Sequence, residues 1–485
     1  MILLKFFILG VLSALLFPPF FMMPLGFVIF SYLIRLLNQI SIKQNLFYYF
    51  SLGFFYGLGF LLVFLFWIQN PFLMNEATKN VSILGLILPV FLSIFFGLGF
   101  TIYKYINKIY LLIIFTPFMF LLIELVITNI LYGFPWITYS FILSNNLIGF
   151  YFLKYFGTYV SSYLIIFIYI LPSLFIYSYS LKNVKKFVSV IHLPFLLVFA
   201  LLFLNLNPSK EKQNKEISLE IFQIYSPINT FDKNLIELDI ITKITNSNAE
   251  YVLFAENNYP YLISDINSTD IMKHIKGNKK VIIGTTRIVK NKFYNSFLFL
   301  EKDNIQIFDK QILVPFGEFL PFRSYLKLLE NISGNVDFTP GNNERIIKSS
   351  DGINILPIIC YEVIFNKILR NINEKEIDIL INITNDSWFG NMLGPYQHFY
   401  HSRMRALISN KYLLRVSNNG ISAIINNNGK VINYTNLNIK ESFRHLLKIK
   451  NTSHFGTIHY ISILYLIFLI FINFIFFRHN FKHDK

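Results

Sequence analysis

The sequence has very little cysteine and few charged residues. Cys360 is the only cysteine among 485 residues, which excludes an internal disulfide bond and a zinc site built from cysteine ligands. Charged residues make up 14% of the chain, whereas a soluble globular protein usually has about 25%. Hydrophobic residues make up 54%, and the mean hydropathy is +0.50. This composition predicts a protein that lies largely in a membrane.

Acidic residues are scarce beside basic ones, and the formal net charge is +16. A nucleic-acid-binding protein gathers its basic residues into one patch, but here they are spread between apolar segments. We therefore expect no nucleic-acid partner. The chain contains no internal repeat and no long low-complexity tract.

Long apolar segments separated by short polar joints fill residues 1–207. A helix needs about 20 apolar residues to cross a bilayer. We expect seven membrane-spanning helices here, near 3–17, 19–37, 46–68, 81–103, 109–131, 155–179 and 187–206. An eighth is expected near 459–477, within a C-terminal part at 450–485 that ends in a cytoplasmic tail. The first segment is short enough for a signal peptide, but no small-x-small cleavage site follows it. We therefore expect a retained helix hairpin.

Basic residues mark every second joint between the expected helices. One set of joints carries Arg35, Lys43, Lys104, Lys108, Lys182, Lys185 and Lys186. The positive-inside rule puts this set in the cytoplasm, together with both termini. The large segment between the seventh and eighth helices then faces the opposite side of the membrane.

Two features of the membrane part are open to a functional interpretation. Glu124 lies within the fifth expected helix, and an ionisable residue inside a span is a functional hypothesis by default. The joint from Tyr132 to Lys154 contains Trp136 and Tyr139, and such side chains prefer the membrane–water interface. This joint is either an aromatic belt or a half-inserted arm beside a lipid-binding cleft.

The pattern changes after a charged linker at residues 208–216. From 217 to 449, short β-like runs alternate with helical stretches, which is typical of a layered α/β domain. Strands are expected at 217–224, 251–255, 280–285, 296–300, 305–308, 353–359, 378–384, 412–416 and 421–426. Helices are expected at 234–246, 361–371 and 396–410.

Glu256, Lys310 and Cys360 all fall at or beside the ends of expected strands, where layered α/β domains commonly assemble their sites. A glutamate can accept a thiol proton, a lysine can stabilise an oxyanion, and a cysteine can form a thioester. The expected helix at 361–371 would place its N-terminus at Cys360 and favour the thiolate. Each residue also has a structural interpretation, since a lone cysteine in an apolar run is usually a small core residue.

Four strings of sequence around these residues are highly specific when they are taken together. They are Lys-x4-Pro-Phe-Gly-Glu at 310–318, Cys-Tyr-Glu at 360–362, Asn-Asp-x-Trp-Phe-Gly at 385–390 and Ser-Asn-Asn-Gly-Ile at 417–421. With them the chain resembles the apolipoprotein N-acyltransferases, membrane enzymes that carry a domain of the nitrilase, or carbon–nitrogen hydrolase, superfamily. The resemblance covers nearly the whole chain. It implies a multi-pass α-helical membrane domain plus an α/β domain with a nitrilase-like α-β-β-α sandwich.

The resemblance implies a Glu-Lys-Cys triad, with Glu256 as proton acceptor, Lys310 as oxyanion stabiliser and Cys360 as nucleophile. It also implies supporting residues at the site. These are Glu318, Tyr361 and Glu362.

Two positions depart from the family's pattern. The family's first motif usually reads Pro-Glu-Ser/Thr-Ala-x-Pro, but residues 255–260 read Ala-Glu-Asn-Asn-Tyr-Pro. An aromatic residue near the start of the domain is often tryptophan in the family, and here it corresponds to Phe231, a candidate substrate-binding residue.

The reaction that the resemblance implies has two steps. Cys360 attacks the sn-1 ester of a glycerophospholipid, commonly phosphatidylethanolamine, and forms a thioester with release of a lysophospholipid. The N-terminal amine of an S-diacylglyceryl-cysteine in an apolipoprotein then takes the acyl chain as an amide. The resemblance thus implies a bacterial inner-membrane enzyme of lipoprotein maturation with a periplasmic catalytic domain and no cofactor. No metal is expected either, because His398 and His401 lack an evident third ligand.

Other interpretations stay open at this level. The segment 320–340 is either an apolar lid over a lipid entrance or an ordinary packed surface helix. The chain as a whole could be a membrane-tethered nitrilase-type amidohydrolase with water as acceptor, or a scaffold that only binds lipoproteins. The triad argues against the scaffold. The eight expected helices argue against the hydrolase, because a water-soluble amide needs no such anchor.

Overall fold

The computed structural model describes residues 1–177 except 42 and 75, and then 212–224, 232–264, 270–325, 330, 334, 336–369 and 376–451. The expected seventh and eighth membrane helices and Phe231 lie outside these residues. Two compact units divide the described chain, one of residues 1–66 and 84–177 and one of residues 67–83 and 212–451. Each unit is described by itself.

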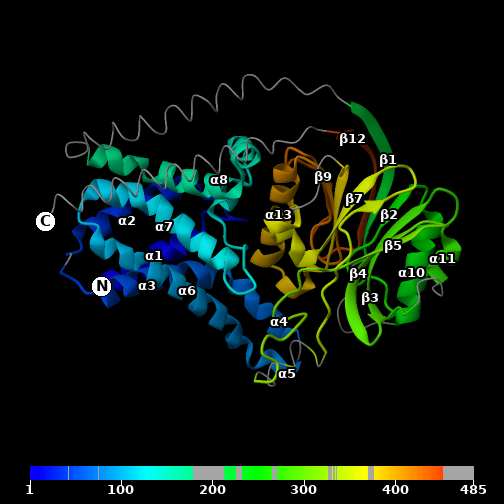
Figure 1. Cartoon of the computed structure of the whole chain (residues 1–485), viewed down its shortest axis with the longest axis horizontal. Coiled ribbons are helices and arrows are strands. Elements are labelled where there is room, and N and C mark those ends of the chain that lie inside the picture. Colours follow the sequence, from blue (N-terminus) through cyan, green and yellow to red (C-terminus); the bar gives the residue numbers. More distant parts are fainter. Residues whose placement is uncertain are drawn as a thin grey trace. The chain divides into compact units, whose positions relative to one another are not determined.

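The first unit is helical (Figure 1). Its main helices are α1 (Ile2–Ala14), α2 (Pro24–Gln39), α3 (Leu46–Phe64), α6 (Ile87–Phe100), α7 (Ile109–Asn129) and α8 (Leu147–Ile176). Asn45 caps the start of α3, since its side chain accepts a hydrogen bond from Tyr48 N at 2.8 Å. α1 and α3 approach closely at Gly10, where a Cβ would lie 2.0 Å from Tyr56 O. Small residues let apolar helices pack backbone to backbone in this way.

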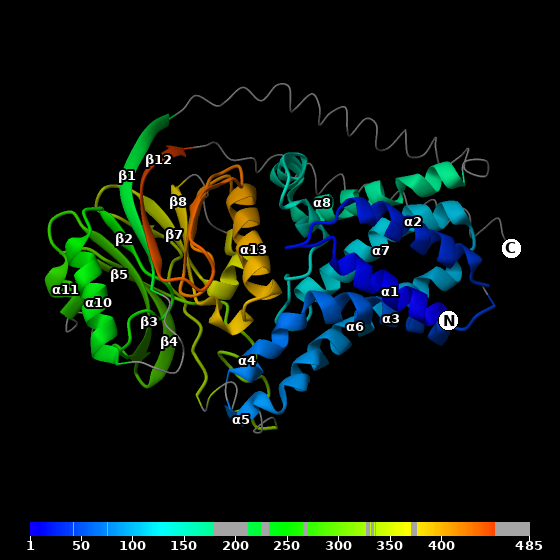
Figure 2. The ribbon, with the colours of Figure 1, turned by 180° about the vertical axis from the view of Figure 1, so that it is seen from behind.

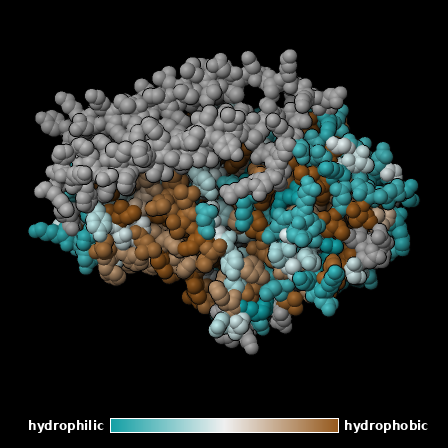
Figure 3. Space-filling view, in the orientation of Figure 1, coloured by the Kyte–Doolittle hydropathy of each residue, from teal (hydrophilic) through white to brown (hydrophobic). Residues whose placement is uncertain are grey.

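Four helical segments among the described residues are long and apolar enough to cross a membrane. They are Leu46–Phe64, Ser82–Tyr105, Ile109–Asn129 and Leu147–Ser173. Hydrophobic residues gather on the surface of this unit over α3 and α6 (Figure 3), and Phe47, Ile87 and Leu98 are more than half exposed. A surface of this kind is suited to lipid rather than water. The expectation of a membrane protein is confirmed.

The joint after α7 is folded into the helical unit. Trp136 and Tyr139 are buried, so these two aromatics do not form an interfacial belt. Glu124, in α7, accepts hydrogen bonds from Thr138 Oγ1 at 2.7 Å, Tyr139 N at 2.9 Å and Ser162 Oγ at 3.1 Å. The buried carboxylate therefore holds the joint against α7 and α8.

The second unit is built on two six-stranded sheets. The first sheet has the order β12 (Glu441–Asn451), β1 (Lys212–Gln223), β2 (Tyr251–Leu253), β3 (Lys280–Val289), β4 (Lys292–Leu300) and β5 (Ile305–Asp309). The second has the order β11 (Val431–Tyr434), β10 (Ala423–Ile425), β9 (Tyr412–Ser417), β8 (Ile379–Thr384), β7 (Asn354–Ile359) and β6 (Ile347–Lys348). β1 begins at Lys212, inside the expected linker.

Side-chain alternation along β2 shows how the layers form. Tyr251, Leu253 and Ala255 point into a core shared with β7, β8 and β9 of the other sheet, whereas Val252 and Phe254 pack under α10 (Lys233–Asn246) and α11 (Asp270–His274). α13 (Leu393–Ser409) covers the outer face of the second sheet (Figure 1 and Figure 2). The order of layers is helix, sheet, sheet and helix, so the expected α-β-β-α sandwich is confirmed.

The expected helix at 361–371 is wrong over its described residues. Two 3₁₀ turns replace it, η8 (Cys360–Ile364) and η9 (Asn366–Leu369), with Phe365 extended between them. All five residues of η8 are buried, so no exposed helix face exists. The Glu362 carboxylate also accepts from Ile359 N, which tightens the turn. Cys360 is therefore not at the N-terminus of an α-helix, and no α-helix dipole favours its thiolate.

Candidate active site

The three candidate triad residues come from the ends of three strands. Glu256 follows β2 and Lys310 follows β5 in the first sheet, while Cys360 follows β7 in the second. Gly284 of β3 leaves room for the first of these, because a Cβ there would lie 2.6 Å from Glu256 Cα. Glu256 Oε2 accepts from Asn385 N at 2.8 Å, which links the first sheet to the loop after β8. The site thus forms where the ends of the two sheets meet.

Lys310 lies between two carboxylates. Its Nζ is 2.8 Å from Glu318 Oε1 and 3.7 Å from Glu256 Oε1, and only 1% of its side chain is exposed. Asn295 Nδ2, from β4, bridges the same two oxygens and donates at 2.7 Å to Glu256 Oε1 and at 2.9 Å to Glu318 Oε1. Val314 N donates to the second oxygen of Glu318 at 2.8 Å. These hydrogen bonds fix the positions of both carboxylates around the lysine ammonium.

The charges of this cluster set its protonation. Burial alone would lower the pKa of Lys310, but the Glu318 and Glu256 carboxylates raise it above its ordinary value. Burial raises the pKa of Glu256, an effect that the Lys310 ammonium opposes. Burial and then the Glu256 charge raise the pKa of the Cys360 thiol, which Lys310 also opposes. The resting site therefore holds an ammonium beside a protonated thiol, and nucleophilic attack requires a base.

The backbone at Cys360 is unusual, with φ at 48°. A residue other than glycine in the left-handed region is strained, and such strain is concentrated at functional sites. Glu362 holds this turn: its Oε2 accepts from Ile359 N at 2.9 Å, and Arg345 Nη2 donates to its Oε1 at 2.7 Å. Burial would raise the pKa of Glu362, but Arg345 holds it below its ordinary value. Glu362 thus supports the backbone next to the candidate nucleophile as a buried carboxylate.

A second buried charge cluster lies behind the nucleophile. Asp386 Oδ2 accepts from Arg415 Nη2 at 2.6 Å, and its Oδ1 lies 2.8 Å from His398 Nδ1. His398 Nε2 is 3.2 Å from the Cys360 carbonyl oxygen. Burial alone would raise the pKa of Asp386, but Arg415 and His398 hold it well below its ordinary value. His398 is therefore part of the support of Cys360.

The altered motif at 255–260 still forms a defined turn. Asn257 has φ at 50°, a conformation that asparagine tolerates better than most residues. Asn258 Oδ1 accepts from Ala255 N at 2.8 Å, so this side chain closes the turn. The backbone that carries Glu256 is therefore closed into a turn despite the departure from the family's pattern.

Sequence reasoning missed several residues of this arrangement. Asn295 and Arg345 lie outside the four sequence strings described above. The only local signal for Asn295 is its polar side chain within the mostly apolar strand β4. Asn385 and Asp386 lie in the string at 385–390, but its pattern does not indicate their contacts with Glu256 and His398. Tyr361 is buried beside Phe365, with ring centroids 5.1 Å apart.

In the segment 320–340, Phe322 and Tyr325 are exposed, and part of that segment lies outside the described residues.

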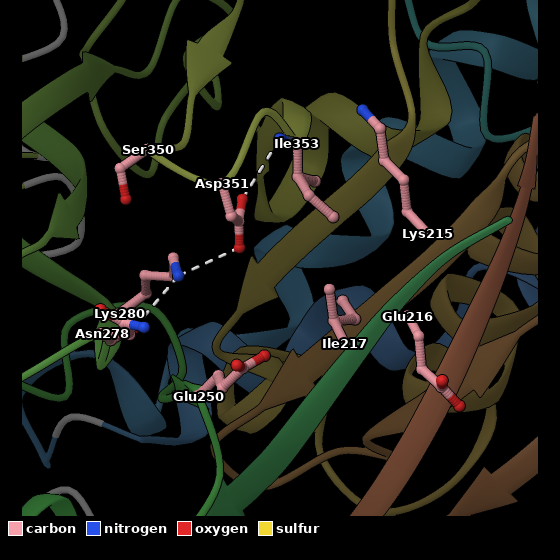
Figure 4. Close-up of a pocket in the computed structure, with 9 residues that line it drawn as sticks. All are labelled: Lys215, Glu216, Ile217, Glu250, Asn278, Lys280, Ser350, Asp351 and Ile353. Carbon is pink, nitrogen blue, oxygen red and sulfur yellow. Dashed lines mark hydrogen bonds and ion pairs between the residues drawn. The ribbon is translucent and has the colours of Figure 1, made fainter. Parts of the chain in front are cut away.

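A polar pocket of about 440 Å³ lies beside β1 and β3 and next to the starts of β2 and β7 (Figure 4). Its walls include Lys280 at the start of β3 and Ile353 just before β7. Lys280 Nζ is 3.0 Å from Asp351 Oδ2, and Lys215 Nζ is 2.7 Å from Asp378 Oδ2. These ion pairs are structural, and we assign the pocket no role in the chemistry.

Comparisons with known proteins cover both units. Residues 231–441 match the carbon–nitrogen hydrolase family, and residues 9–171 match the apolipoprotein N-acyltransferase N-terminal domain. Among solved structures, a CN-hydrolase superfamily protein from Xanthomonas campestris has a TM-score of 0.37 at 14% identity, covering 48% of this chain and 91% of that one. Nit3 of Saccharomyces cerevisiae, a member of the nitrilase superfamily, has a TM-score of 0.39 at 16% identity, covering 50% and 93%.

Three relatives that match this chain over most of their length share the description apolipoprotein N-acyltransferase. The apolipoprotein N-acyltransferase of Rickettsia typhi is 31% identical over 463 residues, which is 89% of each chain. That of Wigglesworthia glossinidia brevipalpis is 31% identical over 448 residues, which is 87% of each chain. That of Brucella suis is 27% identical over 473 residues, covering 88% of this chain and 86% of that one. With this identity over nearly its full length, the chain belongs to the apolipoprotein N-acyltransferase family and is a membrane acyltransferase.

Proposed function

We propose that this acyltransferase N-acylates lipoproteins through a thioester on Cys360. The acyl donor is the sn-1 ester of a membrane glycerophospholipid, with phosphatidylethanolamine as the expected donor. The acceptor is the N-terminal amine of an S-diacylglyceryl-cysteine. The observation that carries the proposal is the Lys310 ammonium, buried between the Glu256 and Glu318 carboxylates at the strand ends that also supply Cys360.

In the first step, Glu256 accepts the Cys360 proton as the sulfur bonds to the ester carbonyl carbon. The Lys310 ammonium stabilises the oxyanion of the tetrahedral intermediate. The C–O bond then breaks, and the leaving alkoxide takes the proton back from Glu256, so that a lysophospholipid departs. The raised pKa of Glu256 suits a group that must both accept and return a proton.

In the second step, the lipoprotein amine attacks the thioester carbonyl and gives a proton to Glu256. The C–S bond breaks, and the thiolate of Cys360 recovers that proton. The products are an amide and the free enzyme. Glu318 and Asn295 orient Lys310 and Glu256 during both steps, and Tyr361 and Glu362 support the nucleophile. Phe231, which lies outside the described residues, stays a candidate for substrate contact.

The charge pattern of the joints supports the proposed orientation, and membership of the family supports the proposed membrane. We place the chain in a bacterial inner membrane, with both termini in the cytoplasm and the catalytic domain in the periplasm. Both substrates are lipids held in a bilayer, so membrane helices in the same chain suit the reaction.

Intact-mass measurement on the purified full-length protein tests the proposal. With phosphatidylethanolamine carrying different acyl chains at sn-1 and sn-2, we expect an adduct of the sn-1 acyl mass, absent in Cys360→Ser. A diacylglyceryl-cysteine peptide should discharge the adduct and gain the same mass. Discharge by water at an equal rate would identify a hydrolase instead. Failure to form any adduct, with no turnover, would overturn the thioester mechanism.

A further inference from the structure

The segment 67–83 lies between α3 and α6 in the sequence, yet it belongs to the compact unit of the catalytic domain. It contains the short helices α4 (Asn70–Leu73) and α5 (Glu76–Lys79), both labelled in Figure 1. Its first residues contact the loop that follows β8. We call residues 385–390 of that loop the Asn385 turn.

Trp67 and Asn70 make the specific contacts. Trp67 is 5% exposed, and its Nε1–H donates to Gln397 Oε1 of α13 at 2.9 Å. Its ring packs edge-on against Phe389, with centroids 4.9 Å apart at 87°. Asn70 Nδ2 donates to Phe389 O at 2.7 Å. Two residues from outside the catalytic sequence thus fix the end of the Asn385 turn.

Two glycines, one in the Asn385 turn and one at the start of α13, leave space for these two side chains. Gly390 has φ at 69°, and a Cβ there would lie 2.3 Å from Asn70 Nδ2. A Cβ on Gly394 would lie 3.0 Å from Trp67 Cγ. Glycine therefore lies where Asn70 approaches the end of the Asn385 turn and where Trp67 approaches the start of α13.

The other end of the same turn reaches the catalytic groups. Asn385 N donates to Glu256 Oε2 at 2.8 Å, and this hydrogen bond lowers the pKa of the carboxyl against the larger effect of burial. Phe389 packs on the ring of His398 at 5.1 Å, and His398 Nε2 lies 3.2 Å from Cys360 O. The turn is short, so a shift at Phe389 displaces the amide that holds Glu256.

We propose that Trp67 and Asn70 are positioning residues for acyl transfer, which act by holding the Asn385 turn against Glu256. This inference rests on the proposed function, in which Glu256 is the base. Loss of either contact lets the Asn385 amide move away from the carboxylate. Glu256 then needs a higher pH to ionise, and the geometry for proton transfer is degraded.

The test compares Trp67→Phe and Asn70→Ala with the control Glu76→Gln in the full-length protein. Trp67→Phe replaces the indole that packs on Phe389 by a smaller ring, and it removes the Nε1–H that donates to Gln397 of α13. The Glu76 side chain is 92% exposed on the same segment. Acyl transfer from phosphatidylethanolamine to a diacylglyceryl-cysteine peptide is measured across pH, together with the rate of Cys360 alkylation by iodoacetamide and the thermal stability.

We expect kcat to fall about tenfold in both variants, with KM for the phospholipid within about twofold of the wild-type value. The acidic limb of the kcat profile should move to higher pH in both, and Glu76→Gln should match the wild type. A lowered melting temperature with an unmoved limb and unchanged kcat per folded enzyme would overturn the inference. If Trp67→Phe does not fold, Asn70→Ala alone decides.

The variant Glu256→Gln separates this inference from the proposed function. If Glu256→Gln keeps the wild-type limb and rate, the base assignment itself is wrong. If Glu256→Gln abolishes the limb while Trp67→Phe and Asn70→Ala leave it in place, the proposed function survives and the positioning role fails.

Discussion

At the scale of single residues, the site depends on buried charged side chains that differ in how many oppositely charged partners they have. Lys310 has two carboxylate partners, whereas Glu362 is paired with Arg345 and Asp386 with Arg415. An unpaired buried charge is costly, so each of these pairs fixes a backbone segment as well as a charge. The carboxyl groups of Glu362 and Asp386 have lowered pKa values, so their stabilisation is present above the unfolded-state pKa and is lost as the pH falls through the folded-state value.

Glu256 differs, because its pKa is raised, and this sets the pH dependence of the proposed mechanism. Ionised Glu256 is required as base, so activity should fall as the pH drops through a value above that of an ordinary glutamate. Glu318 contributes to this rise through its negative charge. Glu318→Gln should therefore move the acidic limb of kcat to lower pH, while the lost contact to Lys310 reduces kcat by about 10-fold to 100-fold.

The pH profile of purified enzyme checks the Glu318→Gln prediction. Glu237→Gln is a suitable control, because Glu237 bonds the Tyr259 hydroxyl and makes no hydrogen bond to the triad among the described contacts. A limb that moved to higher pH in Glu318→Gln would show that Glu318 does not raise the pKa of Glu256.

At the scale of elements, the sequence predicted the strands well and the local turns poorly. Every expected strand of the second unit occurs, because each is a compact run of β-branched and aromatic residues bounded by turn residues. The short strands β6 and β11 and the edge strand β12 were missed. β12 has charged residues on one face, and the apolar Leu447 and Ile449 reach the core only through pairing with β1. Such pairing is a tertiary effect that local patterns do not reveal.

In the candidate site too, the strand ends were predicted correctly and the local turn was not. Strand ends predicted where Glu256, Lys310 and Cys360 lie, because layered α/β domains commonly assemble their sites there. The first two follow strands of one sheet, and Cys360 follows a strand of the other. The conformation at Cys360 was predicted wrongly, because it depends on Glu362 bonding to Arg345 and to the backbone of residues 311 and 312. These partners are distant in sequence, and no local periodicity encodes them.

Glu124 provides a test at this scale, in the helical unit. Its carboxylate accepts hydrogen bonds from Thr138, Tyr139 and Ser162, all in a buried region. Glu124→Ala leaves those donors without this acceptor, and each buried unsatisfied donor costs about 1–3 kcal/mol. We expect a clear loss of thermal stability in detergent, measured by unfolding of the purified protein.

Ile130→Ala is the matched control for Glu124→Ala, since Ile130 is exposed at the end of the same helix. A change in Glu124→Ala no larger than that of the control would show that the carboxylate does not hold the joint. Loss of acyl transfer with unchanged stability would instead favour a direct functional role for Glu124.

At the scale of the whole molecule, two compact units are interleaved in one chain. The segment 67–83 leaves the helical sequence and joins the unit of the catalytic domain, which the sequence did not predict. Most of it was expected as a short joint between the membrane helices at 46–68 and 81–103, and only the tertiary contacts of Trp67 and Asn70 reveal its place. Local patterns therefore predict the number and type of elements better than the unit to which each belongs.

Because the chain has a single cysteine, the proposed membrane orientation can be tested by labelling cysteines introduced one at a time. Cys360→Ser yields a chain without cysteine, in which a single exposed cysteine can be placed on either side. Lys302→Cys lies at an exposed turn of the catalytic unit, and Ser41→Cys lies at an exposed joint between α2 and α3. In intact spheroplasts, a membrane-impermeant maleimide should label Lys302→Cys and should leave Ser41→Cys unlabelled until the cells are lysed. The reason is the asymmetry of Lys and Arg between alternate joints, which retains the basic joints in the cytoplasm. The reverse labelling would place the catalytic domain in the cytoplasm and would overturn the proposed orientation.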